Sequence, residues 1–527
     1  MHLLGSVYSA GLLCLLTAVP MTGGEGVHNI LEYGAKPDGK TLCTAAIQKA
    51  IDAAADNGGG TVRFPPGTFL SGALRMRSQV TLSLDEGATL LGSRNHADYY
   101  GPPTDAEGRE VEGDPVFRNL IHGEDLHDIA IRGKGAIDGS GDAFRDKTKK
   151  RPKNIYFENC RGVLVEDVRL QDAGCWMQHY RLCEDLTIRN VDVFNHIAFN
   201  NDGMNIDSCR NVTITGCRVD SDDDAVVLKS LSEQPCRNVT ISDCTISSHC
   251  NALKMGTESG GGFVDITIRN CTVFSPKHSK SIYGRQRGLA GIALEIVDGG
   301  RLENVTVSDV DIEGVSVPIF LRLGNRARLY GRDEKPGVGT FRNVLLRNIT
   351  ARGTSSIGCS ITGLPGHPIE DVRLENIRLG FEGGGTKTDT ERQIEEKEAS
   401  YPESTMFGTL PAYGFYCRHV KGLRFVNLQL GTDQTDLRHA MMFDDAEDVE
   451  IDGLDAQFSP GAAAMIRMVQ ARGAVIRGCS PTSPVDTLLQ LQGEATREIR
   501  LERSDLDQVR NVADISPEVP EGALSQE

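Results

Sequence analysis

Apolar residues recur along the chain in short alternating runs, and each run is followed by a turn rich in Asn, Asp or Gly. The segments "EDLTIRNVDV", "RNVTITGCRV" and "RNVTISDCTI" share one template of strand, turn and second strand. Alternation of apolar and polar positions is typical of β-strands, because successive side chains point to opposite faces of a sheet. The marker residues of five consecutive segments, spaced 23, 26, 27 and 27 residues apart, are Val163, Leu186, Val212, Val239 and Ile266.

A repeat of this length predicts the coils of a β-solenoid. One coil cannot bury its inner face alone, so coils stack about 4.8 Å apart and form parallel sheets around one continuous core. Further marker residues that fit the template are Val80, Ile129, Val305, Val344, Val372, Leu423 and Val449. We therefore expect an all-β chain with one solenoid domain over residues 25–515 and a flexible tail over residues 516–527.

Helical periodicity is nearly absent, and "CTAAIQKAIDAAADN" at residues 43–57 is the clear exception. We expect this amphipathic helix to cap the N-terminal end of the solenoid, where it would cover an open sheet edge. Longer excursions interrupt the repeat at residues 275–290, 324–340 and 379–415. In solenoids such insertions gather on one face and often wall a binding groove.

Cysteines and asparagines occupy equivalent positions in successive coils. The cysteines that directly precede or follow the first strand of a coil are Cys160, Cys183, Cys209, Cys236, Cys217, Cys244 and Cys271. Because equivalent positions stack, this pattern favours small buried ladder residues over the alternative, a disulfide framework. A second ladder, made of turn residues, is predicted at Asn190, Asn270, Asn348, Asn376 and Asn427.

The formal net charge is −17 and no basic stripe is visible, so nucleic acid and anionic membranes are poor partners. Residues 3–19 are mostly apolar, but this run is too short and too polar for a membrane span. We predict a secretion signal over residues 1–24, with a disordered apolar tail as the alternative. The mature protein would then be secreted or periplasmic and free of membrane anchorage, and we expect a monomer.

The chemistry of the chain is concentrated in "NNDGMNIDSCRNVTITGCRVDSDDDAVVLKS", residues 200–230, which has an acidic cluster near each end. Superposing successive coils places Asp202, Asp224 and Asn251 in one column. Asp223 should lie beside that column, and His249 one column further on. Carboxylates from two different coils are thereby expected to converge on one small region of the surface.

Carboxylates packed in this way repel one another. Two unit charges about 5 Å apart interact by roughly 3 kcal/mol at an effective dielectric constant of 20. At least one pKa should therefore rise unless a cation intervenes. A raised carboxyl beside an ionised one is what glycoside hydrolysis needs, with an acid for the leaving oxygen and a base for water. The alternatives are a solvated acidic turn and a calcium site, although no Asp-rich nonapeptide repeat or EF-hand loop is present.

Several motifs give the chain a resemblance to a known family. "LEYGAKPDGKTLCTAAIQKAIDAAADNGGGTVRFPPGTFLSGALRMRSQVTLSLDEGATLLGS" is followed by "IRGKGAIDGSGDAF" and "RPKNIYFENC", and by Asn-Asn-Asp ending at Asp202 and Asp-Asp at Asp223 and Asp224. Together they resemble the polygalacturonase family, glycoside hydrolase family 28. The resemblance implies a right-handed parallel β-helix and inverting hydrolysis without a metal or other cofactor. It assigns Asp223 as the general acid, with Asp202 and Asp224 holding the attacking water.

Two departures from the family pattern concern substrate binding. The Gly-His-Gly motif should fall near Asn251, which takes the histidine position, while His249 lies two residues earlier on the same face. The Arg-Ile-Lys motif, which holds a galacturonate carboxylate in the family, should fall where Glu295 and Val297 stand. We therefore expect His249 and Asn251 to contact the substrate.

Two cations are candidates to compensate for the missing basic motif. Counting along the coils places Lys254 and Arg322 on either side of Glu295 in one column, where they would neutralise it or bind the substrate. The expected activity is an exported hydrolase of pectin-like or other acidic polysaccharides or oligosaccharides, made exo-acting by the insertion at residues 379–415. The alternatives are a calcium-dependent lyase or epimerase and a non-catalytic carbohydrate-binding solenoid.

Overall fold

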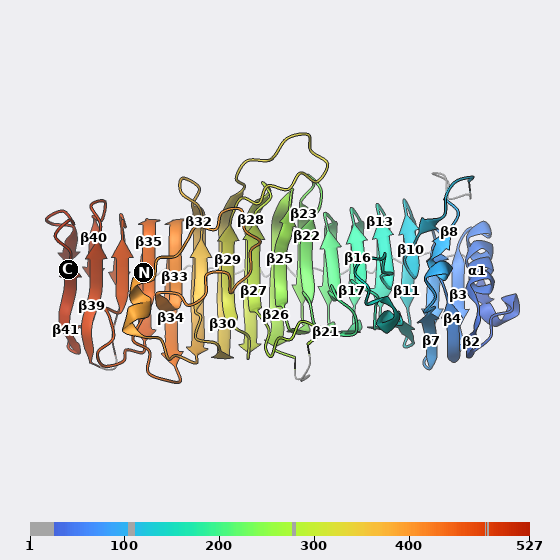
Figure 1. Ribbon diagram of the computed structural model, residues 1–527, viewed down its shortest axis with the longest axis horizontal. Coiled ribbons are helices and arrows are strands. Elements are labelled where there is room, and N and C mark those ends of the chain that lie inside the picture. The colour runs from blue at the N-terminus through green and yellow to red at the C-terminus, as the bar shows by residue number, and fades with distance from the viewer. Residues whose placement is uncertain (1–25, 104–110, 277–280, 480, 482–483) are drawn as a thin grey trace, which may run out of the picture.

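Over the residues that the structure describes, the protein is a long stack of parallel strands wound as a β-helix, with one α-helix near the N-terminal end of the stack (Figure 1). The computed structural model describes residues 26–103, 111–276, 281–479, 481 and 484–527. The predicted secretion signal lies outside these residues. Within them, no helix is long and apolar enough to cross a bilayer. The expected all-β solenoid is confirmed.

Three series of strands run along the stack, and each strand pairs in parallel with its counterpart one coil away. The first series, on which the candidate site lies, is β5 (Leu74–Arg75), β10 (Ile121–Glu124), β13 (Ile155–Glu158), β16 (Gln178–Arg181), β19 (Met204–Asp207), β22 (Val226–Ser230), β25 (Asn251–Ser259), β27 (Ala290–Ile296), β29 (Val317–Leu323), β31 (Cys359–Thr362), β33 (Ala412–Lys421), β35 (His439–Glu447), β37 (Ile466–Val469), β39 (Val485–Gln492) and β41 (Val509–Ile515).

The second series carries the marker residues of the repeat. It is β1 (Val27–Asn29), β3 (Gly60–Phe64), β6 (Val80–Leu84), β11 (His127–Arg132), β14 (Arg161–Glu166), β17 (Glu184–Arg189), β20 (Arg210–Thr215), β23 (Cys236–Ser242), β26 (Gly262–Phe274), β28 (Arg301–Glu313), β30 (Thr340–Thr354), β32 (Ile369–Phe381), β34 (Arg424–Thr432), β36 (Glu450–Ala456), β38 (Val475–Arg477), β40 (Ile499–Glu502) and β42 (Leu524–Gln526).

The third series merges into the second, because β26 pairs with both β23 and the last strand of the third series. The strands of the third series are β2 (Asp38–Leu42), β4 (Gly67–Ser71), β7 (Ala88–Gly92), β12 (Ala136–Asp138), β15 (Arg169–Gln171), β18 (Asp192–Asn195), β21 (Arg218–Ser221) and β24 (Thr245–Ser248). The remaining elements are a small antiparallel pair and short 3-10 turns: β8 (Tyr100–Gly101), β9 (Val116–Phe117), η1 (Ile30–Tyr33), η2 (His96–Tyr99), η3 (Gly141–Phe144) and η4 (Lys387–Glu391).

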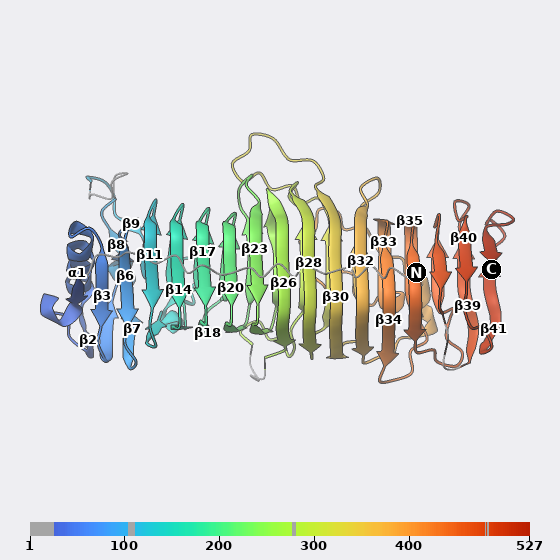
Figure 2. The same cartoon turned by 180° about the vertical axis from the view of Figure 1, so that it is seen from behind.

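The predicted register is confirmed at the marker residues. Val163 pairs with Leu186, which pairs with Val212, and the column continues through Val239 and Ile266. These side chains are at most 2% exposed, because alternate residues of each strand point into the shared core. Figure 2 shows the same column of strands from behind.

Both predicted ladders are present. The described cysteines are all free thiols and nearly all buried, so the ladder interpretation is confirmed over the disulfide framework. The turn asparagines adopt positive φ and pass side-chain hydrogen bonds from coil to coil, as from Asn427 to Asn376 and from Asn376 to Asn348. Asn tolerates the left-handed conformation because its short side chain bonds to the local backbone.

The two ends of the stack are covered differently. Helix α1 (Thr44–Asp56) buries Ile47, Ala50, Ile51 and Ala54 against the first strands, which confirms the predicted cap. Residues 516–527 were expected to form a flexible tail, but β42 pairs with β40 and extends the stack beyond residue 515.

The three predicted insertions leave the stack between strands of the first and second series. They connect β26 to β27, β29 to β30, and β32 to β33. The longest one folds back over the outer face of the first series, where Phe407 and Leu410 pack against Ala293 and Phe320. This apolar contact buries the outer face on the C-terminal side of β25 and leaves the N-terminal side uncovered by the insertion.

Candidate active site

The acidic cluster lies where strands of the first series begin. Asp202 precedes β19, and Asp223 and Asp224 precede β22. Met204 pairs with Val226 and Val226 with Leu253, which brings Asp202, Asp224 and Asn251 onto adjacent coils. Asn251 donates a hydrogen bond of 2.8 Å to Asp224. The predicted column is therefore confirmed.

The three carboxyls do not share one electrostatic environment. Burial, followed by the charge of Asp223, raises the pKa of Asp202 well above its ordinary value. Burial and the charge of Asp224 also raise the pKa of Asp223. Burial alone would raise the pKa of Asp224, but the charges of two lysines and the hydrogen bond from Asn251 outweigh it and lower that pKa. A carboxyl whose pKa is raised, Asp223, thus stands beside one whose pKa is lowered, Asp224.

Two buried lysines supply the cations that keep Asp224 ionised. Lys254 Nζ lies 3.1 Å from Asp224 Oδ2 and 3.9 Å from Glu295 Oε2. Lys229 Nζ lies 3.5 Å from Asp202 Oδ2 and 3.2 Å from a carboxylate oxygen of Glu258. Sequence reasoning identified Lys254 and missed Lys229 and Glu258. The strand register offered the signal, since the side chain of Lys229 points outward on β22, two residues after Val227, which pairs with Lys254.

Tyr283 and Cys250 also contact the carboxyls and were not predicted as site residues. The hydroxyl of Tyr283 donates a 2.6 Å hydrogen bond to Asp223 Oδ2. The Sγ atom of Cys250 lies within 4.8 Å of carboxylate oxygens of Asp223 and Asp224. A shift of one coil places Cys250 over Asp223, so the sequence held that signal, whereas Tyr283 comes from an aperiodic insertion.

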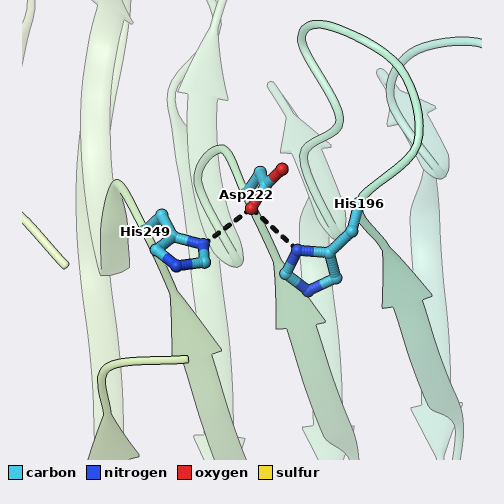
Figure 3. A group of neighbouring side chains, drawn as sticks. All are labelled: His196, Asp222 and His249. Carbon is cyan, nitrogen blue, oxygen red and sulfur yellow. Dashed lines mark hydrogen bonds and ion pairs between the residues drawn. The ribbon is translucent and has the colours of Figure 1, made fainter. Parts of the chain in front are cut away.

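His249 belongs to a second cluster, in which it and His196 both point toward Asp222 (Figure 3). Its Nδ1 lies 2.6 Å from Asp222 Oδ1, and His196 Nδ1 lies 2.8 Å from the same oxygen. The other oxygen of Asp222 accepts a hydrogen bond from the backbone N–H of Ile282, next to Tyr283. His249 has no exposed surface, so its substrate contact stays a prediction while the structure gives it a role in holding this loop.

The charge on His196 should make the stability of this cluster depend on pH. Burial lowers the pKa of His196, but hydrogen bonds to Asp220 and Asp222 outweigh burial and raise it to about 9. The stabilisation is complete below the unfolded value of about 6.5 and is lost as the pH rises through about 9. We expect the thermal midpoint to fall over this window, and His196→Gln to flatten the fall.

Thermal unfolding of both proteins at a series of pH values tests this expectation. His127→Gln is the matched control, because His127 is exposed and pairs only with its neighbour Asp128. Equal pH slopes in wild type and His196→Gln would contradict the assignment of the charge to His196.

The predicted column around Glu295 is correct for Arg322 and wrong for Lys254. Arg322 pairs with Glu295, whereas Lys254 pairs with Ala293, two positions before Glu295 on β27. Lys254 nevertheless reaches Glu295 from its neighbouring position. Burial raises the pKa of Glu295 to about 8, so this carboxyl is largely uncharged at neutral pH.

Arg322 is engaged by the long insertion. It is 1% exposed and donates to the backbone carbonyls of Gly363, Glu396 and Lys397. Its contact with substrate stays a prediction, and its contacts in the structure hold the insertion in place. The same insertion brings Tyr401 to Lys254, whose Nζ lies 5.6 Å from the ring centroid.

Two groups of side chains place metal-binding atoms within 4.8 Å of one another: His196, Asp222 and His249, and Asp223, Asp224 and Cys250. Calcium takes six to eight oxygen ligands, so neither group matches it in number or kind. The atoms of the first group already hydrogen-bond to one another. The second group holds one carboxyl whose pKa is raised beside one whose pKa is lowered, which suits proton transfer in both directions.

Comparison with known proteins agrees with this geometry. The family model described as "Glycosyl hydrolases family 28" matches residues 62–400, and one described as "Rhamnogalacturonase A/epimerase, pectate lyase-like" matches residues 27–92. A probable polygalacturonase of Vitis vinifera is 29% identical over 38% of this chain and 44% of its own length. An exo-poly-alpha-D-galacturonosidase of Dickeya chrysanthemi is 38% identical over 29% of this chain and 26% of its own length. The chain thus spans about a quarter to a half of the length of these two relatives.

Solved structures show the same fold. An exopolygalacturonase from Thermotoga maritima superposes with a TM-score of 0.60 at 22% identity, covering 77% of this chain and 92% of that one. A family 28 exopolygalacturonase from Yersinia enterocolitica superposes with a TM-score of 0.62 at 18% identity, covering 81% of this chain and 79% of that one. The right-handed parallel β-helix is thereby confirmed. With the family model matching well over half of its residues, the chain belongs to glycosyl hydrolases family 28.

Proposed function

We propose that the protein is an exo-acting glycoside hydrolase of pectin-like or other acidic glycans. The observation that carries the proposal is the pairing of Asp223, whose pKa is raised, with Asp224, whose pKa is lowered. An acid and a base side by side supply both proton transfers of glycoside hydrolysis. Family membership and the names of the matched relatives, which include exopolygalacturonases, support the substrate class.

In the proposed reaction Asp223 gives its proton to the glycosidic oxygen as the bond from that oxygen to the anomeric carbon breaks. Water forms the new bond to the anomeric carbon, and its proton passes to Asp224, with Asp202 helping to hold the water. Carboxylate oxygens of Asp223 and Asp224 lie within 4.8 Å of one another, closer than the roughly 6.5–9.5 Å of most inverting glycosidases. Inversion is therefore supported by the family resemblance and not by the spacing.

The insertion at residues 379–415 supports attack at a chain end. It covers the outer face of the first strand series beyond Lys254, so a glycan lying along that face could not continue past this point. A groove closed on one side favours a terminal sugar over the middle of a chain. The test is to measure the size of the first products. Exo attack releases short fragments from chain ends, whereas random attack lowers the mean length of the polysaccharide from the start.

The experiment that tests the activity measures reducing ends and ultraviolet absorbance on a panel of acidic polysaccharides, with and without a calcium chelator. Hydrolysis gives new reducing ends without absorbance, and the chelator has no effect. A lyase gives both signals and loses them with the chelator, and a binding protein gives neither. Either of the last two results would overturn the proposal.

Tyr283→Phe should shift the pH profile upward on its alkaline side. The Tyr283 hydroxyl donates to the ionised form of Asp223 and lowers the pKa of that carboxyl. Without this donor the pKa rises further, so the acid stays protonated to higher pH. The measurement is kcat against pH for wild type and Tyr283→Phe, with Tyr100→Phe as an exposed control. An unchanged or lowered alkaline limb would contradict the role of Tyr283.

A further inference from the structure

A cavity of about 670 Å³ opens near the N-terminal end of the strand series that carries the carboxyls. Its wall includes Arg75 of β5, His122 of β10, Tyr156 of β13 and the adjoining Phe117 and Arg118. These strands lie toward the α1 end of the stack (Figure 1). The cavity is thus on the side of the site that the long insertion leaves uncovered.

Buried polar atoms of this wall lack partners. Nη1 of Arg75 and both ring nitrogens of His122 make no hydrogen bond with the residues that the structure describes. His122 is only 6% exposed. Leaving such a group unpaired costs about 1–3 kcal/mol, so three unpaired atoms around one cavity point to a ligand.

The charges of the wall suit an acidic ligand. Three arginines, Arg75, Arg77 and Arg118, face the cavity together with Glu124 and Asp125. Arg77 is paired with aspartates of α1, and Arg118 donates to a backbone carbonyl. Asp125 in turn accepts a hydrogen bond from an asparagine of the next coil. Arg75 forms no ion pair with a residue that the structure describes, so its guanidinium is the group available to a carboxylate, for which arginine has a matching fork geometry.

His122 adds the means to recognise a sugar hydroxyl. Burial and the nearby arginines lower its pKa to about 3, so the ring is neutral at the pH of most assays. A neutral imidazole has one nitrogen that donates and one that accepts, which matches a hydroxyl group. Phe117 and Tyr156 offer aromatic faces in the same cavity. A uronosyl residue combines a carboxylate, hydroxyls and an apolar face in one unit.

Cationic and aromatic side chains lie between this cavity and the carboxyls. Lys229, which contacts Asp202, lies 4.7 Å from the ring centroid of Trp176, and Lys153 lies over the rings of both Trp176 and Tyr156. In the strand register His122 stands three coils before the coil of Asp202. At about 4.8 Å per coil this separation is roughly 14 Å, the span of a few sugar units.

We propose that this cavity is a distal subsite that binds a uronosyl residue of an acidic glycan whose end is held at Asp223 and Asp224. The inference rests on the proposed function for the nature of the ligand. The carboxylate of the distal residue bonds to Arg75, and its hydroxyls bond to His122. The subsite makes the affinity depend on chain length and on charge far from the bond that is cleaved.

The test measures binding of galacturonate oligomers by titration calorimetry to the full chain carrying Asp223→Asn, which prevents turnover. Adding Arg75→Gln should weaken the acidic hexamer about tenfold or more, the loss of one charge-assisted hydrogen bond. The acidic dimer, which is too short to reach the cavity, and the methyl-esterified hexamer should change little. Arg75→Lys, which keeps the charge and the stem, should retain most of the affinity.

The matched control is Arg63→Gln, because Arg63 is exposed and pairs with Asp85 outside the cavity. Thermal unfolding confirms that each variant is folded. Equal hexamer affinity in the Arg75→Gln and Arg63→Gln proteins overturns the subsite, and so does a loss that is as large for the dimer as for the hexamer. Failure of the proposed function has a different signature, the absence of new reducing ends from wild type while binding that depends on Arg75 persists.

Discussion

Replacing Asp223 by Asn is expected to remove at least roughly a few hundredfold of kcat while the protein stays folded, because general acid–base steps contribute about 10² to 10⁴. Asn is isosteric with Asp and cannot protonate the leaving oxygen. Asp202→Asn and Asp224→Asn should lose activity to a similar extent, because both carboxyls are assigned to the attacking water. The measurement is kcat on the best acidic glycan, with thermal unfolding alongside.

The three variants should differ in thermal stability. Asp223→Asn removes a half-buried carboxyl whose ionisation is already disfavoured, so the thermal midpoint should hold or rise. Asp224→Asn removes the partner of Lys254 and leaves a buried cation without its charge pair, which costs about 3–5 kcal/mol. Asp192→Asn, at an exposed strand position, is the control for both readouts.

Two results would count against these assignments. Near-normal turnover by Asp223→Asn would remove it as the general acid. Retention of the anomeric configuration, read from the first product by nuclear magnetic resonance, would contradict direct attack by water and favour a covalent intermediate.

The coil repeat explains why the carboxyls could be placed from the sequence. Asp202, Asp224 and Asn251 lie at equivalent positions of three coils, 22 and 27 residues apart, so aligning the coils fixes their column. Parallel pairing leaves little freedom in this register, because a slip by one residue would turn the apolar face outward. The raised pKa also followed from the convergence of charges, although the compensating Lys229 was missed.

The same reasoning fails where the repeat is interrupted. Lys254 was placed beside Glu295, but that count runs across the aperiodic insertion at residues 275–290, and Lys254 pairs with Ala293 instead. Insertions have no periodicity that could fix their position. Tyr283 and Tyr401 therefore reach the site without a signal in the sequence, and Arg322 is turned from the groove by backbone carbonyls of a segment 74 residues away.

The chain should be a poor enzyme on plain polygalacturonan. The family resemblance expects Arg and Lys where Glu295 and Val297 stand, and the nearest cation, Lys254, is paired with Asp224. Glu295 is fully buried and largely uncharged, so it offers a carboxyl hydrogen instead of a positive charge. A uronate carboxylate at this subsite would lose a charge-assisted hydrogen bond, which lowers kcat/KM by about 10- to 100-fold.

We accordingly expect higher kcat/KM on branched, substituted or short acidic glycans than on unmodified polygalacturonan. Glu295 has no exposed surface and adds no positive charge to this subsite, and its Oε1 has no partner within the described structure. Glu295→Gln keeps a buried donor and should preserve the preference, whereas ionisation of Glu295 above a pH of about 8 should weaken activity on every acidic substrate. Efficient random cleavage of plain polygalacturonan would overturn this prediction and show that Lys254 can hold a uronate while it is paired with Asp224.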